Sequence, residues 1–273
     1  MSTTPALTGE QLTLRYNKTS VVHGVSIALE PGRVTALVGP NGSGKSTLLR
    51  SLARLHPVHE GTVTLGASTT PLTSRDFAQE VTLFSQSRPA PQGLSVKEVV
   101  AFGRHPYRRR FAGLTADDKK AINHALHATG VSDMADRAVG ELSGGEVQRV
   151  WLAACLAQDT GVVLLDEPTN HLDLRYQIET LDLVRDLAEN HGVAVGIVLH
   201  DLDHAARVAD TLLLLSAGSI HASGRPLDVL TAENISEVYQ ISVEVSVDPV
   251  SHHLRIDPVG RHPARTSPRK DQS

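Results

Sequence analysis

The sequence has 273 residues, of which 40% are hydrophobic and 21% are charged, and its formal net charge is −4. This composition is ordinary for a globular protein and excludes a fibrous or largely disordered chain. The negative net charge provides no general attraction to nucleic acid, so a nucleic-acid function would need a local basic patch.

The first predicted elements are an antiparallel hairpin and a buried strand. Leu12, Leu14 and Tyr16 alternate with polar residues, and the alternation returns over residues 25–29, which is the pattern of strands with one buried face. Residues 34–38 form a mainly apolar run. Such a run is typical of a strand that is buried on both faces of a parallel sheet.

The middle of the chain changes from strand spacing to helical spacing and back. Short strands are predicted at 61–65 and 81–84, and helical spacing from 95 to about 142 predicts an inserted helical subdomain. Further strands and helical segments then alternate, with strands at 162–165, 193–199 and 212–215 and helices at 177–189 and 203–209. This alternation predicts an α/β fold with a mainly parallel sheet.

The end of the chain is predicted to be peripheral. A helix is expected near 227–239 and a weak strand at 243–247, whereas the stretch from 260 onward is rich in Pro, Arg, Ser and Lys. Almost nothing apolar in that stretch can offset the entropy of ordering it, so we predict a disordered tail.

Three features bear on where the protein works. The longest apolar runs, such as 162–165, are far shorter than the roughly 20 residues that a membrane-spanning helix requires. The N-terminal stretch lacks the pattern of a secretory signal, so we expect a cytoplasmic location. Cys155 is the only cysteine, which excludes an internal disulfide, and its apolar neighbours predict a buried thiol.

A glycine-rich loop follows the strand at 34–38 and precedes a helix that opens near Thr47. Its residues fit the pattern G-x-x-x-x-G-K-[ST]: Gly39, Pro40, Asn41, Gly42, Ser43, Gly44, Lys45 and Ser46. Glycines let backbone N–H groups turn inward, and a helix N-terminus adds partial positive charge, so the loop suits a polyphosphate. Lys45 would reach the β and γ phosphates, and the Ser46 hydroxyl would bind Mg²⁺. A glycine-rich turn that binds nothing is the alternative.

Two adjacent carboxylates, Asp166 and Glu167, end the apolar run at 162–165, and Pro168 stops the strand. Ligands of open α/β sheets bind at such carboxyl ends, beside the phosphate loop if the two strands are neighbours. Asp166 then suits the Mg²⁺ shell, and Glu167 suits a general base that polarises the attacking water. Taken alone, the pair is equally compatible with a helix N-cap.

A second glycine motif, Leu142-Ser143-Gly144-Gly145-Glu146, precedes another predicted helix. Ser143 and Glu146 have the spacing of a capping box, which by itself accounts for both residues. The two glycines are not explained in this way, because each costs about 1 kcal/mol relative to alanine inside a helix. That cost makes sense if a ligand approaches the backbone closely.

Together these motifs resemble those of ATP-binding cassette (ABC) ATPases over residues of about 10 to 250. Six elements carry the resemblance in the family's order: the phosphate loop, Gln86 after a strand, LSGGE at 142–146, LLDEP at 164–168, NHLD at 170–173 and His200. The resemblance implies a P-loop NTPase (RecA-like) core with an N-terminal antiparallel β subdomain and an inserted α-helical subdomain. The expected ATPase domain is 8–258, with the helical subdomain at about 88–155 and the tail at 259–273.

The resemblance also implies roles in binding ATP. Tyr16 would stack on the adenine, and Thr47 would lie behind the phosphates at the start of the helix. Ser143, Gly144 and Gly145 would bind the γ phosphate of a nucleotide held by a second copy of the chain, so the implied assembly is a homodimer.

The resemblance implies roles for three further residues, of which Gln86 and His200 are expected to be catalytic and Asp173 is expected to belong to the ATP-binding site. Gln86 would link Mg²⁺ and the attacking water to a transmembrane partner, Asp173 would lie in the loop that joins the two sites, and His200 would contact the γ phosphate. Without the other motifs, Tyr16, Gln86 and His200 would be interpreted as ordinary core or surface residues. The sequence departs from the family at Glu146, where Gln is common, and at Asp203, where Asn is usual in the subfamily considered next.

Within the family, three stretches resemble ATPases that import iron-siderophore, haem and cobalamin compounds: 99–106, 156–160 and 199–205. The resemblance implies a homodimer on the cytoplasmic face of the membrane, bound to two permease subunits and fed by an extracellular or periplasmic binding protein, with no nucleic-acid partner. Gly103 to Pro106 would lie where members receive the permease, which favours a siderophore as cargo. Alternatively, the arginine run from Arg104 to Arg110 is only a solvated basic surface and does not contact a permease.

Two other classes of function are weighed against the importer. A soluble cassette ATPase acting on ribosomes or DNA would carry a second cassette or a long inserted coiled coil, and the sequence has neither. A non-catalytic scaffold is disfavoured because Lys45, Asp166, Glu167 and His200 are all intact.

Overall fold

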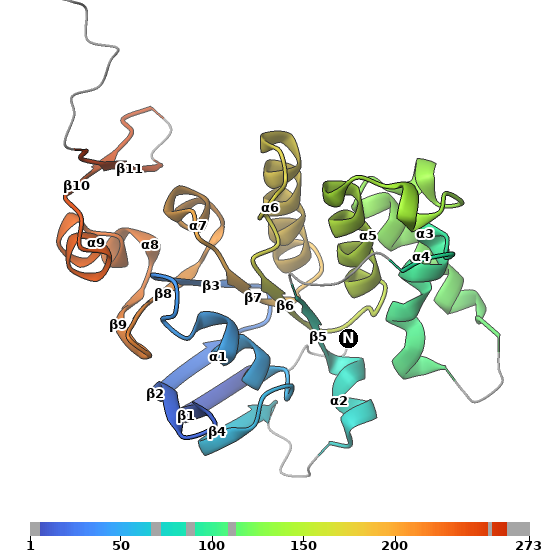
Figure 1. The fold of residues 1–273 in the computed structure, drawn as a ribbon, viewed down its shortest axis with the longest axis horizontal. Helices are drawn as coiled ribbons and strands as arrows, with labels where there is room; N and C mark the ends of the chain where they lie inside the picture. Colours follow the sequence, from blue (N-terminus) through green and yellow to red (C-terminus); the bar gives the residue numbers. More distant parts are fainter. Residues whose placement is uncertain (1–5, 67–71, 86–90, 109–112, 251–252, 261–273) are drawn as a thin grey trace, which may run out of the picture.

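A computed structural model describes residues 6–66, 72–85, 91–108, 113–250 and 253–260. A six-stranded sheet with the order β5-β6-β7-β3-β8-β9 crosses the molecule (Figure 1). Its strands are β3 (Val34–Val38), β5 (Val81–Phe84), β6 (Val162–Asp166), β7 (Ala194–Val198), β8 (Thr211–Ser216) and β9 (Ser219–Gly224). All neighbouring strands are parallel except β9, which returns antiparallel to β8. The predicted α/β architecture with a mainly parallel sheet is confirmed.

The central strands are apolar on both faces because each face packs against a different core. In β6, Val162 and Leu164 belong to one hydrophobic cluster, and Val163 and Leu165 belong to the other. The alternation follows from the two-residue period of a strand. In β6 the charged side chain therefore lies at the carboxyl end, beyond the part of the strand that both cores cover.

A three-stranded antiparallel sheet with the order β2-β1-β4 covers one face of the central sheet. It contains β1 (Leu7–Tyr16), β2 (Thr19–Leu29) and β4 (Val58–Leu65). Its apolar side shares a core with α1 (Lys45–Leu52), as Figure 1 shows below the central strands. The hairpin predicted from the alternation of Leu12 and Leu14 is therefore present, and these two side chains are fully buried.

The other face of the central sheet is covered by helices. They are α5 (Gly144–Leu156), α6 (Leu174–Glu189), α7 (Leu202–Val208), α8 (Pro226–Val229) and α9 (Ala232–Tyr239). Cys155 of α5 is a buried thiol within this core, as the sequence predicted.

A separate block of helices lies at one end of the molecule, next to β5 (Figure 1). It contains α3 (Val96–Val100), η1 (Ala101–Tyr107), α4 (Ala116–Ala128), η2 (Ser132–Met134), η3 (Val139–Glu141) and α5, while α2 (Ser74–Glu80) contacts η1 from the core side. The block has its own hydrophobic cluster. Gly103 is required where η1 crosses α5, because a Cβ there would lie 2.1 Å from the Ala154 carbonyl oxygen.

Arg104 is buried inside this block, with only 6% of its surface exposed. Its Nε donates to Asp118 over 2.8 Å, and its Nη1 donates to the Ala157 carbonyl over 3.0 Å. Arg104 is therefore not part of a solvated basic surface, and it does not face a partner protein. Arg109 and Arg110 lie outside the described residues.

The C-terminal part differs from the sequence prediction in two ways. The helix expected near 227–239 is broken between α8 and α9, where Thr231 caps α9 by accepting a hydrogen bond from the Asn234 N–H. The strand at 243–247 is β10 (Val243–Val247), and it pairs with a second strand, β11 (Leu254–Pro258), that the sequence did not predict. The Ile256 N–H of β11 also donates to the Asp203 carboxylate over 3.3 Å, which gives the unusual Asp203 a structural role.

No helix among the described residues is long and apolar enough to cross a membrane. Val259 still belongs to the hairpin, because its N–H donates to the Ser242 carbonyl. Residues 261–273, which form most of the predicted tail, lie outside the described residues.

The buried pair of Arg104 and Asp118 leads to a stability prediction. Burial alone would raise the pKa of Asp118, but hydrogen bonds from Arg104 and Thr115 outweigh it and hold the pKa below its ordinary value. Asp118→Asn leaves Arg104 buried without a counter-charge, so we expect chemical denaturation to show a loss of about 3–5 kcal/mol. Because the folded-state pKa is lowered, this loss should be complete above pH of about 4 and should shrink at lower pH.

The matched control is Glu179→Gln, which removes the acid of an exposed pair with Arg175. It should change the free energy of unfolding very little, because exposed ion pairs contribute little. Equal effects of the two substitutions would contradict the interpretation of the buried pair.

Candidate nucleotide site

The phosphate loop joins β3 to α1 and depends on glycine at two positions. Gly39 and Gly44 have φ values of 142° and 97°, which side chains rarely allow. A Cβ on Gly39 would lie 2.1 Å from the Leu215 carbonyl oxygen, and one on Gly44 would lie 2.8 Å from a Val22 methyl group. Gly44 is also the N-cap of α1. The loop therefore leads directly into a helix N-terminus, the arrangement that suits an anion.

The rest of the loop varies in burial. Ser43 is buried, Pro40 and Thr47 are half-buried, and Asn41 and Gly42 are exposed.

Lys45 is buried and its ammonium group is held inside the loop. Its Nζ donates to the carbonyl oxygens of Gly39 and Pro40 over 2.8 and 2.9 Å. Burial lowers the pKa of Lys45, and the nearby charges of Glu167 and Asp166 oppose that shift. The loop thus encloses the ammonium group of Lys45.

The Ser46 hydroxyl donates to Asp166 Oδ1 over 2.6 Å, so the helix start and the end of β6 meet. We expected Asp166 to lie beside the phosphate loop if β3 and β6 were neighbouring strands. They are not neighbours, because β7 lies between them. The contact forms because Asp166, the last residue of β6, and Ser46, in the first turn of α1, both lie at the carboxyl edge of the sheet. Burial raises the pKa of Asp166, while the Ser46 hydrogen bond and the Arg50 charge oppose that shift.

Glu167 is held between two side chains at the same edge. Its Oε1 lies 2.5 Å from His200 Nε2, and its Oε2 accepts from Asn170 Nδ2 over 2.6 Å. The backbone of Glu167 has a φ of 56°, in the left-handed region that costs free energy for a residue with a side chain. Asn170 belongs to the NHLD motif but was not among the predicted site residues. No sequence signal indicates that its amide reaches back three residues to Glu167.

The interpretation of the acid pair as a helix N-cap is wrong. The next helix, α6, begins at Leu174, and its N-cap is Asp173, whose side chain accepts from the Tyr176 N–H over 3.1 Å. Asp166 and Glu167 are therefore free of a capping role. Asp173 does have a capping role. This role gives a local reason for an Asp at this position, which the resemblance placed in the loop that joins the two sites.

The second glycine motif begins α5 and contains the predicted capping box. Ser143 N–H donates to Glu146 Oε2 over 2.8 Å, and the Glu146 N–H returns a bond to the Ser143 hydroxyl. A Cβ on Gly144 would meet nothing within 4 Å, and one on Gly145 would make an ordinary contact with Leu172. The packing of this chain therefore requires neither glycine.

The two glycine motifs lie in different parts of the molecule. Figure 1 shows α5 in the helical block, displaced from α1 across the sheet. The start of α5 instead approaches the loop after β6, where Gln148 Nε2 donates to the Pro168 carbonyl over 2.8 Å. Ser143, Gly144 and Gly145 do not join Lys45 in one cluster within a single chain.

Tyr16 lies at the end of β1, with 45% of its surface exposed. Its ring centroid is 4.6 Å from that of His56, at an interplanar angle of 49°, a contact that the sequence analysis did not foresee. Gln86 lies outside the described residues, so its predicted role stays a prediction.

A sequence profile described as "ABC transporter" matches residues 22–170, more than half of the chain. The chain belongs to the ABC transporter family. The predicted P-loop NTPase fold is confirmed, and the chain is of the ATPase class. A chain from an ABC transporter in an inward-facing conformation has the same fold, with a TM-score of 0.79, 27% identity and coverage of 94% of this chain and 98% of that one.

Three relatives have sequences similar to that of this ABC protein over most of its length. The ferric enterobactin transport ATP-binding protein of Escherichia coli is 41% identical, over 93% of this chain and 94% of that protein. The iron(3+)-hydroxamate import ATP-binding protein of Bacillus subtilis is 39% identical, over 89% and 91%. The cobalamin import ATP-binding protein of Halobacterium salinarum is 40% identical, over 93% of this chain and 63% of that protein.

The capping box of this ABC ATPase gives a prediction about Glu146. Hydrogen bonds from the Ser143 N–H and hydroxyl lower the pKa of Glu146, so its contribution is present above a pH of about 4.3 and is lost as the pH falls below that value. Glu146→Gln keeps an acceptor for Ser143 and should retain most of the stability at pH 7, whereas Glu146→Ala should lose about 1 kcal/mol. Thermal denaturation of both variants across this pH range is the measurement, and a Gln variant as unstable as the Ala variant would contradict the capping role.

Proposed function

We propose that this chain is the ATP-hydrolysing subunit of an importer that takes up an iron chelate, with a siderophore as its cargo. The observation that carries the ATPase part is the convergence of Lys45, Ser46, Asp166, Glu167 and His200 at one edge of the sheet. The names of the iron-chelate relatives support the cargo part.

The donor set fits Mg²⁺, which binds hard oxygen ligands. The Ser46 hydroxyl and the buried Asp166 carboxylate are such ligands, and they lie 2.6 Å apart. With Gln86, they are the residues that would hold the ion. When bound, Mg²⁺ would neutralise part of the charge of the β and γ phosphates.

In this proposal Glu167 is the general base for the attacking water. The contact with His200 fixes one carboxylate oxygen, and the amide of Asn170 fixes the other. Both contacts restrict the rotation of the carboxylate, which favours a defined position for the water that it polarises. Asn170 is thus a positioning residue, and His200 would contact the γ phosphate beside the base.

One chain holds only part of the proposed site. The glycines at the start of α5 are not needed by their own surroundings and lie away from the phosphate loop. A second copy, docked so that its Ser143, Gly144 and Gly145 face the nucleotide on this chain, would complete the site at both loops of a homodimer. Asp173, at the N-terminus of α6, would lie between the two sites, and Tyr16 offers an exposed ring to the adenine.

The remaining partners follow from the importer proposal. Two permease subunits would bind the dimer at the cytoplasmic face of the membrane, and a binding protein would deliver the chelate from outside. The helical block exposes Phe102, with 49% of its surface accessible, beside the buried Arg104. Phe102 is therefore a better candidate for contact with the permease than Arg104. The relatives' names give no support to the soluble-ATPase alternative. One relative, 40% identical, is a cobalamin import ATP-binding protein, so the cobalamin alternative is included in the cargo test below.

The assignment of Glu167 is tested by Glu167→Gln. The phosphate loop is unchanged while the base is lost, so this variant should bind ATP, hydrolyse it very slowly and accumulate as an ATP-held dimer. Asn170→Ala keeps the carboxylate and should lower kcat less severely, with little change in KM. ATPase kinetics and size-exclusion chromatography with ATP are the measurements, and near-normal turnover by Glu167→Gln would rule it out as the base.

The cargo is tested by growth on defined iron sources. A deletion strain should lose growth on one ferric siderophore, and wild type should restore it while Lys45→Ala should not. Uptake of haem and cobalamin is measured in the same strain. Normal use of every iron chelate by the deletion strain, with no redundant system present, would reject the siderophore proposal, and a defect confined to haem or cobalamin would replace it.

A further inference from the structure

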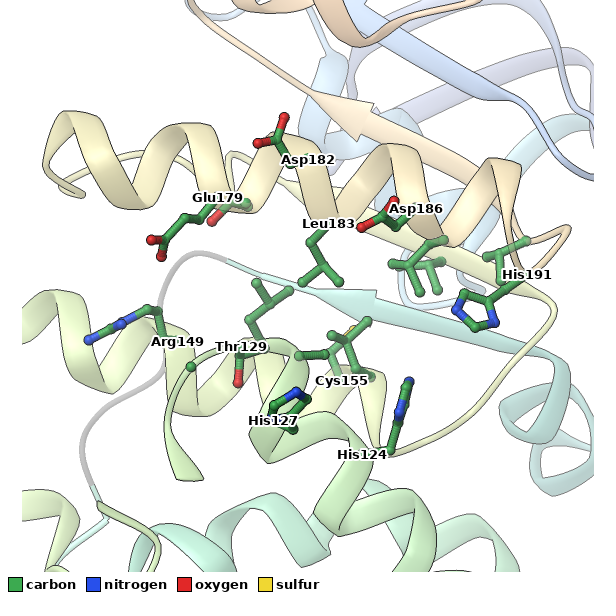
Figure 2. Close-up of a pocket in the computed structure, with 18 of the residues that line it drawn as sticks. His124, His127, Thr129, Arg149, Cys155, Glu179, Asp182, Leu183, Asp186 and His191 are labelled. Atoms are coloured by element: carbon green, nitrogen blue, oxygen red, sulfur yellow. The ribbon is translucent and has the colours of Figure 1, made fainter. Parts of the chain in front are cut away.

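A cavity of about 1000 Å³ lies between the helical block and α6, away from the phosphate loop. Figure 2 shows Arg149 and Glu179 toward one end of it, His124 and His191 toward the other, and Leu183 between them. Apolar side chains from α5, β6 and α6 also line the cavity: Leu152, Leu156, Val163, Leu183 and Leu187. The cavity therefore combines apolar and polar lining, as small-molecule sites commonly do.

Arg149 of α5 is 92% buried, since only 8% of its surface is exposed, and its Nε has no hydrogen-bond acceptor among the described residues. Its guanidinium stacks on the Tyr176 ring, with Cζ 3.6 Å from the ring centroid. Stacking does not satisfy the N–H groups, because they point sideways in the guanidinium plane. Glu146 attracts Arg149 electrostatically, but its carboxylate is bound to Ser143 in the capping box. The Nε atom has almost no accessible surface, so an anion in the cavity would pair with the terminal nitrogens of Arg149, which make no hydrogen bond or ion pair among the described residues.

The acidic residues of α6 around the cavity already have partners. Glu179 accepts from Arg175 over 2.7 Å, Asp186 accepts from Asn190 over 3.0 Å, and Asp182 lies 3.9 Å from Arg207. Because these acids have other partners, none of them forms an ion pair with Arg149. The same acids, with Asp159, keep the surroundings negative, so a singly charged ligand is favoured over a phosphate dianion.

We propose that this cavity is a binding site for a small organic monocarboxylate. The carboxylate pairs with Arg149, and an apolar, aromatic or branched body lies against Leu152 of α5 and Leu183 of α6. Because the ligand contacts both helices, it would hold the helical block against α6. The site is independent of the proposed transport function, and its test requires no ATP turnover.

The test is calorimetric titration of the full chain with indole-3-acetate and with its neutral isostere indole-3-acetamide. The acid should bind about tenfold or more tightly than the amide, because only the acid forms a charge-assisted bond with Arg149. Arg149→Met should remove this preference. Leu183→Trp, which fills the cavity from α6, should abolish binding of both probes, whereas Leu174→Trp is the matched control, because Leu174 is 72% exposed and lies outside the lining.

Three results would overturn the proposal: no saturable binding by the wild type, equal affinity for acid and amide, or binding that survives Leu183→Trp. If Arg149→Met fails to fold, Arg149→Lys replaces it. Lys keeps the charge but loses the planar fork, so the acid should still bind more tightly than the amide, by a smaller factor.

Discussion

Burial of the central strands on both faces is the constraint on which the rest of the structure depends. Because the β6 side chains from Val162 to Leu165 alternate between two apolar cores, polar side chains are tolerated only where the strand ends. Asp166 and Glu167 occupy that end, and the phosphate loop occupies the equivalent end of β3. The chemistry of the protein is thus concentrated on one edge of the sheet by the same packing that stabilises it.

That edge brings opposite charges close together in a partly buried space. Burial acts against ionisation of both Asp166 and Lys45, raising one pKa and lowering the other, and their mutual attraction partly offsets the cost. A bound polyphosphate would add negative charge next to Lys45 and the carboxylates. The arrangement therefore favours binding of the nucleotide together with a divalent cation, since the cation balances the charges that the protein side chains leave unpaired.

Local sequence patterns predicted the features that have a recognisable motif or a repeating period. The loop from Gly39 to Ser46, the capping box of Ser143 and the apolar strand at 162–165 all belong to this class. Contacts that arise from folding were not predictable, because no periodicity records them: the bond from Asn170 to Glu167, the stacking of Tyr16 with His56 and the ion pair of Arg104 with Asp118. The last case reversed an expectation, since a surface-like basic stretch proved to have a buried arginine.

The helical block is attached unevenly to the rest of the molecule. It is tied firmly at one side, where Thr82 of β5 donates to the Gln158 side chain, and Arg104 of η1 donates to the Gln158 carbonyl. Toward α6 the contact is interrupted by a cavity with a stacked but underbonded Arg149. A block fixed along one edge and loosely packed along another can tilt with little loss of buried apolar surface. Because Ser143 to Gly145 lie at the start of α5, such a tilt would displace the glycine motif that we propose a second copy presents, while the phosphate loop stays fixed to the sheet.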